Sequence, residues 1–245
     1  MFLKTVKLKD GFVPNTAIYP FSIPALAQLK ELSFDHAVTF FVGENGSGKS
    51  TLLEGMADRI GFNPAGGSKQ NFQAYDVHAA ESALGEYLRL SWMPRVTEGF
   101  FLRAETFYQF ASHIDEVDMT GYRDYGGKSL HAQSHGESFF SLFQHRFKGN
   151  SIYLLDEPEA ALSPNRQLAF LRLMHDLLKD GNVQFIIATH SPILLGYPNS
   201  QIYHFDESGI ESIAYSDTEH YQVTSYFLQH RERMLEQLFI DEDDE

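Results

Sequence analysis

The segment Gly43-Glu44-Asn45-Gly46-Ser47-Gly48-Lys49-Ser50 matches the pattern G-x-x-x-x-G-K-[ST], which is typical of loops that hold phosphate groups. An apolar run at Ala37–Val42 precedes the segment and predicts a buried strand. The apolar periodicity of Ser50–Ile60 predicts a helix directly after it. Because the pattern stands between a strand and a helix, we interpret it as a phosphate-binding loop and not as a chance match in a glycine-rich turn.

The residue types in this loop suit the binding of ATP together with Mg²⁺. Its glycines allow backbone N–H groups to approach the phosphates, and the N-terminus of the following helix adds partial positive charge. We expect Lys49 to neutralise the β- and γ-phosphate oxygens and the Ser50 hydroxyl to reach Mg²⁺. The residues of this region predicted to contact the nucleotide are Gly43, Glu44, Asn45, Gly46, Ser47, Gly48, Lys49, Ser50 and Thr51.

Two acids stand side by side at the end of another apolar run. Asp156 and Glu157 directly follow Ser151–Leu155, which predicts a buried strand. Ligands of α/β sheets bind at the carboxyl ends of the strands, so both carboxylates are expected near the phosphate loop. Asp156 is predicted to hold Mg²⁺ through water, and Glu157 to polarise the attacking water as a general base. The competing interpretation is a strand that simply ends in polar residues.

Strand and helix patterns alternate along the chain and predict an α/β fold with a mainly parallel central sheet flanked by helices. Continuous apolar runs are expected for strands that are covered on both faces. The segments predicted as strands are Lys4–Leu8, Ala37–Val42, Gly99–Arg103, Ser151–Leu155 and Val183–Ala188, with a hairpin near Gln201–Ile213. Those predicted as helices are Ser50–Ile60, Glu105–Val117, Glu137–Lys148 and Arg166–Lys179. Those predicted as loops are Gly61–Gln73 and Gly121–Gly136.

The C-terminal stretch Thr218–Phe239 has an apolar periodicity that predicts one further helix. Its apolar side chains are expected to face the core, and these are Tyr221, Leu228, Leu235 and Phe239. Residues 241–245 are all acidic and predict a solvated tail.

The composition excludes several classes of site and partner. The 245 residues contain no cysteine, which excludes disulfides, cysteine-ligated zinc and thiol catalysis. The formal net charge of −14 argues against a broad, sequence-independent grip on nucleic acid. A local basic strip at Lys4, Lys7 and Lys9 stays open, with ordinary solvated surface as the simpler interpretation. No stretch approaches the roughly 20 apolar residues of a membrane-spanning helix, so we expect a cytoplasmic protein.

The residues around Asp156 resemble a known family. The run Leu154-Leu155-Asp156-Glu157-Pro158-Glu159-Ala160-Ala161-Leu162 resembles the Walker B motif and D-loop of ABC-type ATPases. Thr189-His190-Ser191, just after the next predicted strand, resembles the switch histidine of the same family.

A third segment is similar to a degenerate form of the LSGGQ signature of these ATPases. In Gln133-Ser134-His135-Gly136-Glu137 the serine, the glycine and the acid fit the signature, whereas Gln133 and His135 depart from it. A plain helix cap followed by a turn is the competing interpretation.

The resemblance implies a site that is built by two chains. In ABC-type ATPases the phosphate loop of one subunit and the signature of a second subunit enclose the nucleotide, so ATP is expected to produce a homodimer. The implied nucleotide-binding residues of the signature are Ser134, Gly136 and Glu137. His190 is implied to hydrogen-bond the γ-phosphate, and together with Lys49 and Glu157 it makes up the predicted catalytic set.

The resemblance also implies a plan for the whole chain. It predicts a single domain over residues 1–240, with an N-terminal antiparallel β subdomain, and an acidic tail at 241–245. A small helical lobe at about 104–148 is expected to carry the signature.

Several positions depart from the family pattern or stay open. The Q-loop glutamine that contacts Mg²⁺ should follow the third predicted strand, yet Glu105 occupies that place. Glu105 is therefore the predicted ligand of a metal-bound water, and Gln109 is the alternative. Ser163 stands where the D-loop usually ends in aspartate. The ring that stacks on adenine is expected to be Tyr19 or Phe21, with a place in the core as the alternative for each.

Within the family, the phosphate loop and the acidic Glu137 are similar to the RecF/SMC-like branch, which includes small stand-alone AAA-family or ABC ATP-binding proteins. We therefore expect Mg²⁺-dependent ATP hydrolysis by a homodimer that acts on an unknown protein partner, in DNA maintenance or defence. The alternative is the ATP-binding subunit of an ABC transporter. A P-loop kinase or GTPase is the third hypothesis, and it is the weakest because the sequence lacks an N-K-x-D guanine-reading motif.

Overall fold

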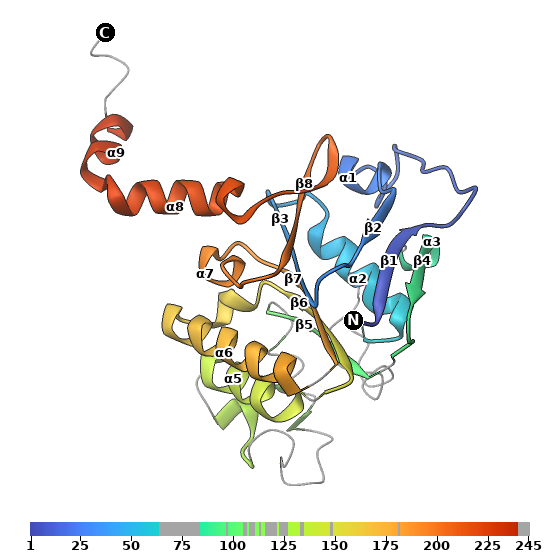
Figure 1. The fold of residues 1–245 in the computed structure, drawn as a ribbon, viewed down its shortest axis with the longest axis horizontal. Helices are drawn as coiled ribbons and strands as arrows, with labels where there is room; N and C mark the ends of the chain where they lie inside the picture. The colour runs from blue at the N-terminus through green and yellow to red at the C-terminus, as the bar shows by residue number, and fades with distance from the viewer. Residues whose placement is uncertain are drawn as a thin grey trace.

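The computed structural model describes residues 1–63, 84–96, 98–104, 107, 111–112, 114–115, 122, 127–132, 135–147, 149–180 and 182–239. A six-stranded sheet runs through the middle of the fold (Figure 1). In spatial order its strands are β5 (Gly99–Arg103), β6 (Ser151–Asp156), β7 (Val183–Ala188), β3 (Val38–Gly43), β8 (Gln201–Asp206) and β9 (Gly209–Ser212). Neighbours are parallel from β5 to β8, and β9 is antiparallel at the edge. The predicted mainly parallel sheet and the hairpin are confirmed.

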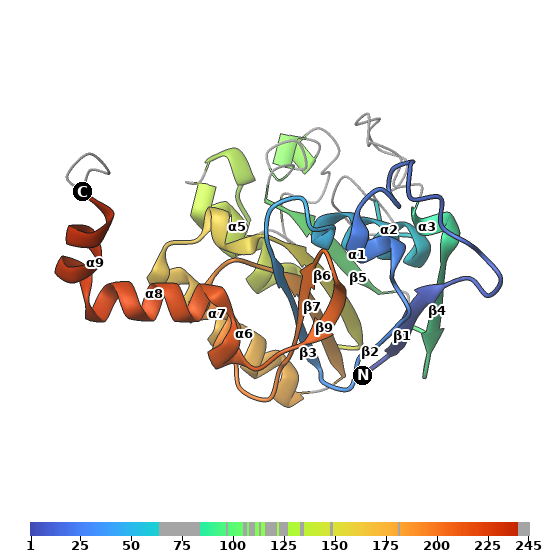
Figure 2. The same cartoon turned by 90° about the horizontal axis from the view of Figure 1, so that it is seen from above.

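A second, antiparallel sheet lies beside the central sheet (Figure 2). Its strands, in spatial order, are β2 (Glu31–Ser33), β1 (Leu3–Leu8) and β4 (Leu88–Trp92). The buried side chain of Gln184 on β7 joins the two sheets, because its Oε1 accepts hydrogen bonds from the backbone N–H groups of Phe2 and Leu3, both at 2.9 Å. The predicted N-terminal antiparallel subdomain is confirmed.

Helices cover both faces of the central sheet (Figures 1 and 2). The face that also carries the antiparallel sheet packs against α1 (Pro24–Ala27), α2 (Lys49–Ile60) and α3 (Leu84–Tyr87). The opposite face packs against α5 (His135–Arg146), α6 (Pro164–Asp180) and α7 (Pro192–Leu195). The bounds of α2, α5 and α6 agree with the predicted helices to within two residues.

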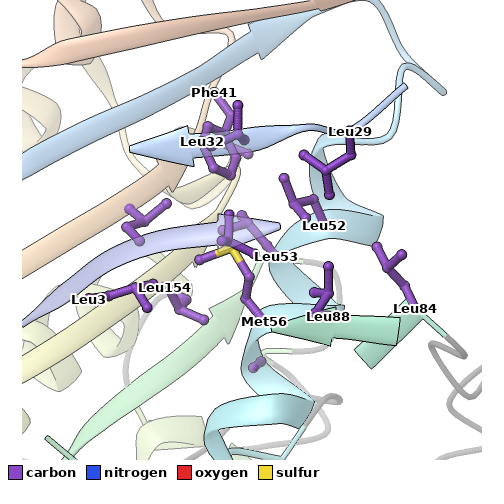
Figure 3. Packing of buried hydrophobic residues seen from close by; sticks show 14 of the residues in the cluster. Leu3, Leu29, Leu32, Phe41, Leu52, Leu53, Met56, Leu84, Leu88 and Leu154 are labelled. Atoms are coloured by element: carbon purple, nitrogen blue, oxygen red, sulfur yellow. The ribbon is translucent and has the colours of Figure 1, made fainter. Parts of the chain in front are cut away.

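Successive residues of the central strands contribute to two different cores. On β3, Phe40 packs on the side of α5 and α6, while Phe41 packs toward α2. Figure 3 shows this second core, in which Leu52, Leu53 and Met56 of α2 meet side chains from both sheets. Burial of apolar surface on both faces explains why these strands are continuous apolar runs and not alternating ones.

The signature-like segment leads into α5, which packs on the central fold through aromatic rings. Phe143 of α5 stacks on Phe170 of α6 with ring centroids 4.5 Å apart. Most of the helix predicted at 105–117 lies outside the described residues, and the loop predicted at 121–136 is described only in part, with a short 3-10 helix at Leu130–Ala132 and the start of α5 at His135. The loop at 61–73 is described only to residue 63. The division into a domain at 1–240, a helical lobe and a tail stays a prediction.

The prediction for the C-terminal stretch was wrong in two respects. The stretch forms two helices, α8 (Glu219–Gln229) and α9 (Arg231–Leu238), which meet at the non-helical residue His230. Both helices project from the body of the molecule (Figures 1 and 2), and neither contributes a buried residue. Leu228 and Phe239 are 74% and 73% exposed instead of facing the core. The pattern predicts an apolar side on a helix, but it does not predict which surface covers that side.

Candidate active site

Three of the predicted segments meet at one edge of the central sheet because their strands are neighbours. β6, β7 and β3 lie side by side and run parallel, so their carboxyl ends fall at the same edge. The phosphate-loop candidate follows β3, Asp156 ends β6 and Glu157 comes next, and His190 stands two residues after β7. The topology thus brings together side chains that are more than 100 residues apart in the sequence, such as Ser50 and Asp156.

The loop after β3 requires glycine at two positions. Gly43 has φ +140°, and a Cβ atom there would lie 2.3 Å from the carbonyl oxygen of Phe205 on β8. Gly48 has φ +101°, and a Cβ atom there would press on the side chains of Leu26 and Ile23 at 3.0 and 3.1 Å. Gly48 is also the N-cap of α2, so no capping side chain covers the first N–H groups of that helix. The loop therefore presents an open helix N-terminus to an anion.

Lys49, the first residue of α2, is the cation of this loop. Its side chain is only 4% exposed, and its ammonium donates to the carbonyl oxygens of Gly43 at 2.7 Å and Glu44 at 2.8 Å. Burial lowers the pKa of Lys49, while the negative charges of Glu157 and Asp156 oppose that shift. These hydrogen bonds hold the ammonium group inside the curve of the loop.

Ser50 and Asp156 form a hydrogen-bonded pair next to the loop. The Ser50 hydroxyl donates to Asp156 Oδ1 at 2.9 Å, and the aspartate is only 5% exposed. Burial raises the pKa of Asp156 to about 7, and the positive charge of Arg103 opposes this rise. Arg103 ends β5, lies 3.5 Å from Asp156 Oδ2 and also pairs with Glu54 of α2. The sequence prediction missed Arg103, although its place at the end of a neighbouring strand was a usable signal.

The Ser50 and Asp156 oxygens fit a magnesium ion that is shared with phosphate groups. Both are hard oxygen donors, the type that Mg²⁺ prefers, and they lie at the base of the phosphate loop. Among the described residues, no group of three or more His, Asp, Glu or Cys side chains could hold a metal ion by itself. Mg²⁺ commonly binds through one or two protein oxygens together with substrate phosphates and water, which agrees with this limited set.

Glu157 and His190 face each other across the edge of the sheet. Glu157 adopts a left-handed conformation with φ +51°, and its backbone N–H donates to the carbonyl oxygen of Ala188 at 2.9 Å. His190 Nε2 lies 3.7 Å from Glu157 Oε1. The backbone N–H of His190 donates to Glu159 Oε1 at 2.6 Å. Glu159 thus fixes the backbone of the histidine, a function that the sequence prediction did not assign.

A cavity of about 630 Å³ lies beside these groups. Its walls include Gly43, Glu44 and Asn45 of the loop together with Glu157 and His190. The other lining residues come from the first turns of α8, and they are Glu219, His220, Val223 and Thr224. The sequence prediction did not connect α8 with this site, because no motif marks those residues.

Glu137, the predicted signature residue whose side chain the structure describes, does not line this cavity. Gly136 and Glu137 lie in the first turn of α5, and Glu137 contributes to a separate cavity of about 420 Å³ with Arg166. The guanidinium of Arg166 lies 3.6 Å from Glu137 Oε1. Ser134 and the predicted metal-water ligand Glu105 lie outside the described residues.

The two aromatic candidates for adenine stacking have different environments. Tyr19 is 50% exposed, and its hydroxyl lies 3.4 Å from Thr51 Oγ1 in the first turn of α2. Phe21 is only 5% exposed and packs edge-on against Tyr87. Phe21 is therefore a core residue, whereas Tyr19 has a free ring surface beside the loop.

Comparisons with known proteins agree with this architecture. A family model described as an AAA ATPase domain matches residues 135–195, which contain Asp156, Glu157 and His190. The SMC head bound to the C-terminal winged-helix domain of ScpA has a TM-score of 0.51 at 12% identity, over 87% of this chain and 98% of that chain. A metal-chelate type ABC transporter in an inward-facing conformation has a TM-score of 0.50 at 16% identity, over 91% and 88% of the two chains. This chain has the fold of an ABC-type P-loop ATPase.

Two curated relatives match parts of this chain. Protein ea59 of Escherichia phage lambda is 53% identical over 45 residues, which cover 18% of this chain and 9% of the relative. The ABC transporter G family member STR2 of Medicago truncatula is 27% identical over 176 residues, which cover 63% of this chain and 24% of the relative. This chain therefore matches less than a quarter of the length of each relative. Across the described part of the chain, no helix combines the length and the apolar character that crossing a membrane requires.

Proposed function

We propose that this chain binds ATP with Mg²⁺ and hydrolyses it between the phosphate loop and Glu157. The observation that carries the proposal is the convergence at one strand edge of Lys49, the Ser50–Asp156 pair and the Glu157–His190 pair. Each member has the chemistry that phosphoryl transfer to water requires, namely a cation, metal-binding oxygens and a carboxylate base.

The phosphates bind in this proposal through the loop and the helix N-terminus. The N–H groups at the start of α2 donate to phosphate oxygens, and the Lys49 ammonium exchanges its contacts with the loop carbonyls for contacts with the β- and γ-phosphates. Ser50 and Asp156 hold Mg²⁺, which when bound neutralises charge on the phosphate oxygens. Tyr19, with its exposed ring beside Thr51, is the proposed platform for adenine.

Glu157 acts as the general base in the proposed reaction. Its carboxylate faces the cavity and is within 3.7 Å of His190 Nε2, so the two side chains bracket one side of the space next to the loop. The carboxylate accepts a proton from the attacking water, and His190 donates a hydrogen bond to the γ-phosphate. General base catalysis of this kind contributes a factor of about 10²–10⁴ in rate.

The complete site in this proposal requires two copies of the chain. Glu137 lines a different cavity from the one beside the phosphate loop, which supports a site in which the loop and the signature come from different chains. A second copy that presents its Ser134, Gly136 and Glu137 to the loop would complete the site. The expected active form is therefore a homodimer with nucleotide at its interface.

The test of this proposal is the substitution Glu157→Gln. It keeps the size of the side chain and removes the base, so steady-state ATPase activity should fall by about 10²–10⁴-fold while ATP binding persists. Unhydrolysed ATP with Mg²⁺ should then hold the dimer together, which size-exclusion chromatography with light scattering would detect. Glu207→Gln, on an exposed carboxylate in the β8–β9 turn, is the matched control.

Two results would contradict different parts of the proposal. Unchanged turnover in Glu157→Gln would contradict the assignment of Glu157 as the general base. If turnover is lost but no dimer forms with ATP and Mg²⁺, the assignment of the base stands and the two-chain site is wrong. The control variant should behave like the unmodified protein in both measurements.

The ATP-binding subunit of an ABC transporter is the alternative function. The match to STR2, which extends over 63% of this chain, favours it. Purification from the native cell would decide between the two functions, because a transporter subunit should copurify with a membrane protein. The stand-alone function predicts a cytoplasmic homodimer that acts on another protein, and stimulation of its ATPase activity by DNA would support a function in DNA maintenance or defence.

A further inference from the structure

Two histidines from distant parts of the sequence meet at the candidate active site. His190 Nδ1 lies 2.8 Å from Nε2 of His220, the second residue of α8. The ring centroids are 5.0 Å apart. The distance is that of a hydrogen bond, so one of the two nitrogens carries the proton and the other accepts it.

The start of α8 is anchored beside the segment that carries His190. Thr218 caps α8 by accepting a hydrogen bond from the N–H of Tyr221 at 3.3 Å. Tyr215, just before the cap, donates its hydroxyl to the carbonyl oxygen of Pro192 at 2.9 Å. These bonds fix the first turn of α8 next to residues 190–192, so the contact between His190 and His220 has structural support on both sides.

Burial lowers the pKa of each imidazole below its ordinary value, which favours the neutral form of both rings at neutral pH. A neutral imidazole has one N–H donor and one acceptor nitrogen. The position of the single proton on His190 therefore depends on which ring donates in the bond to His220. Two arrangements exist, and they leave different groups at His190 Nε2.

The surroundings of His190 Nε2 distinguish the two arrangements. If His190 Nδ1–H donates, Nε2 presents a lone pair toward the Glu157 carboxylate 3.7 Å away, and two electron-rich groups face each other. If His220 Nε2–H donates, Nε2 of His190 carries the proton, and this N–H group faces the negatively charged carboxylate. His190 Nε2 has no hydrogen-bond partner among the described residues, which leaves it available to a ligand in the cavity.

We propose that His220 is a positioning residue whose Nε2–H donates to His190 Nδ1 and so keeps the catalytic proton of His190 on Nε2. The proposal rests on the proposed ATPase function, in which His190 donates to the γ-phosphate. A preset donor needs no rearrangement when negative charge develops on the phosphate, which is how fixed donors stabilise transition states. His220 does not itself touch the reacting atoms.

The kinetic test uses two substitutions of His220 and one control. His220→Leu removes the donor and should lower kcat by about 10–100-fold, by analogy with the loss of a partner that fixes the tautomer of a metal-ligating histidine. KM should stay within about twofold, because the loss concerns the transition state and not ground-state binding. His220→Gln keeps an N–H donor on a side chain of similar reach and should restore most of the activity. His175→Leu, on an exposed histidine of α6, should have no effect.

The second measurement reads the tautomer of His190 without ATP turnover. NMR of the protein with ¹⁵N-labelled histidine distinguishes a protonated ring nitrogen from an unprotonated one. The unmodified protein should show the His190 proton on Nε2, and His220→Leu should shift the population toward Nδ1–H. The His190→Gln variant assigns the signals.

The outcomes separate this proposal from the proposed function. A His190 proton on Nδ1 in the unmodified protein would overturn the positioning role, and so would unchanged kcat in His220→Leu. If the unmodified protein has no ATPase activity, the proposed function fails while the NMR measurement still decides the tautomer. If the leucine variant does not fold, the glutamine variant and the tautomer of the unmodified protein remain as tests.

Discussion

The strand-edge site and the C-terminal helices α8 and α9 differ in how they are held. In the site, Lys49 and Asp156 are 4% and 5% exposed, and each is hydrogen-bonded to a neighbour, Lys49 to the Gly43 carbonyl and Asp156 to the Ser50 hydroxyl. In α8 and α9, large apolar side chains such as Leu228 and Phe239 are 74% and 73% exposed. The comparison teaches that a motif with defined chemistry predicts its own neighbours, whereas an amphipathic pattern predicts only that some neighbour exists.

The two regions nevertheless meet at one point. The first turns of α8 form a wall of the cavity beside the phosphate loop, and His220 reaches His190 there. The exposed part of α8 and the whole of α9 extend away from this contact (Figure 2). One end of α8 therefore lines the site while the rest of the helix is exposed, and substitutions can test this difference.

The largest expected effect concerns the core beneath the phosphate loop. Leu53 on α2 is fully buried in the core shown in Figure 3. Leu53→Ala should lower the free energy of unfolding by about 2–5 kcal/mol, because it removes buried methyl groups and leaves a cavity. Urea denaturation followed by circular dichroism measures this change. If Leu53→Ala lowers the free energy of unfolding no more than Leu228→Ala does, the predicted difference between the buried core and the exposed helix is wrong.

The next effect concerns the cation of the site. Lys49→Ala should weaken ATP binding by about 10–100-fold, since it removes hydrogen bonds from a charged donor to the phosphates, and turnover should stop. Isothermal titration calorimetry with ATP and Mg²⁺ measures the affinity. Lys179→Ala, on an exposed lysine of α6, is the control and should bind ATP normally. Equal affinities in the two variants would contradict the assignment of the phosphate loop.

A third prediction concerns acidification of the contact between the two regions. Because burial lowers the pKa of His190 and of His220, the folded protein binds fewer protons than the unfolded chain between these lowered values and about 6.5. Stability from this pair is therefore complete above about pH 6.5 and falls as the pH drops through the folded-state pKa values. The other charges that act on the pair are Lys49, which lowers the pKa values, and Glu157, Glu44 and Glu219, which raise them.

The test compares the unmodified protein with a variant that carries both His190→Gln and His220→Gln. The urea midpoint of each protein is measured at about pH 8 and about pH 5.5, because these two pH values lie on either side of the ordinary histidine pKa. The unmodified protein should lose more stability than the double variant over this interval. Equal losses would show that the pair contributes nothing to the pH dependence.

The smallest expected effect concerns α8 beyond the contact. Leu228→Ala should change the free energy of unfolding by no more than about 0.5 kcal/mol, because the side chain is 74% exposed and has little apolar contact to lose. The same urea measurement that tests Leu53→Ala applies. A loss similar to that of Leu53→Ala would mean that α8 is covered in solution, and a dependence of the loss on protein concentration would identify the cover as a second copy.

The sequence predicts the positions of residues that belong to a motif with a defined chemical role. Gly43, Lys49, Ser50 and Asp156 could be predicted because a phosphate loop and an acidic strand end accept few alternatives, and parallel strands put their ends at one edge. The structure brings Ser50 and Asp156 together as expected. Their roles in catalysis remain predictions, as do those of Ser134 and Glu105, which lie outside the described residues.

The sequence does not predict residues that act through a tertiary contact. His220 meets His190 across 30 residues, and Glu159 reaches the His190 backbone across 31 residues, without a pattern that marks either pair. The course of α8 and α9 was also unpredictable, because propensity and periodicity describe a helix and not its direction. The contacts of His190 and the direction of α8 and α9 depend on how distant segments pack, which a sequence pattern does not describe.

The left-handed backbone of Glu157 has a consequence for how this protein can change. Glycine and asparagine adopt φ +51° more easily than glutamate does, and holding other residues there costs of order 1–3 kcal/mol. Replacement of Glu157 by glycine should therefore raise the melting temperature while it removes the carboxylate. Selection for heat resistance alone would favour variants that have lost Glu157. A library of variants screened for stability should therefore also be screened for ATP turnover. Thermal robustness and activity select different residues at the same place in the chain.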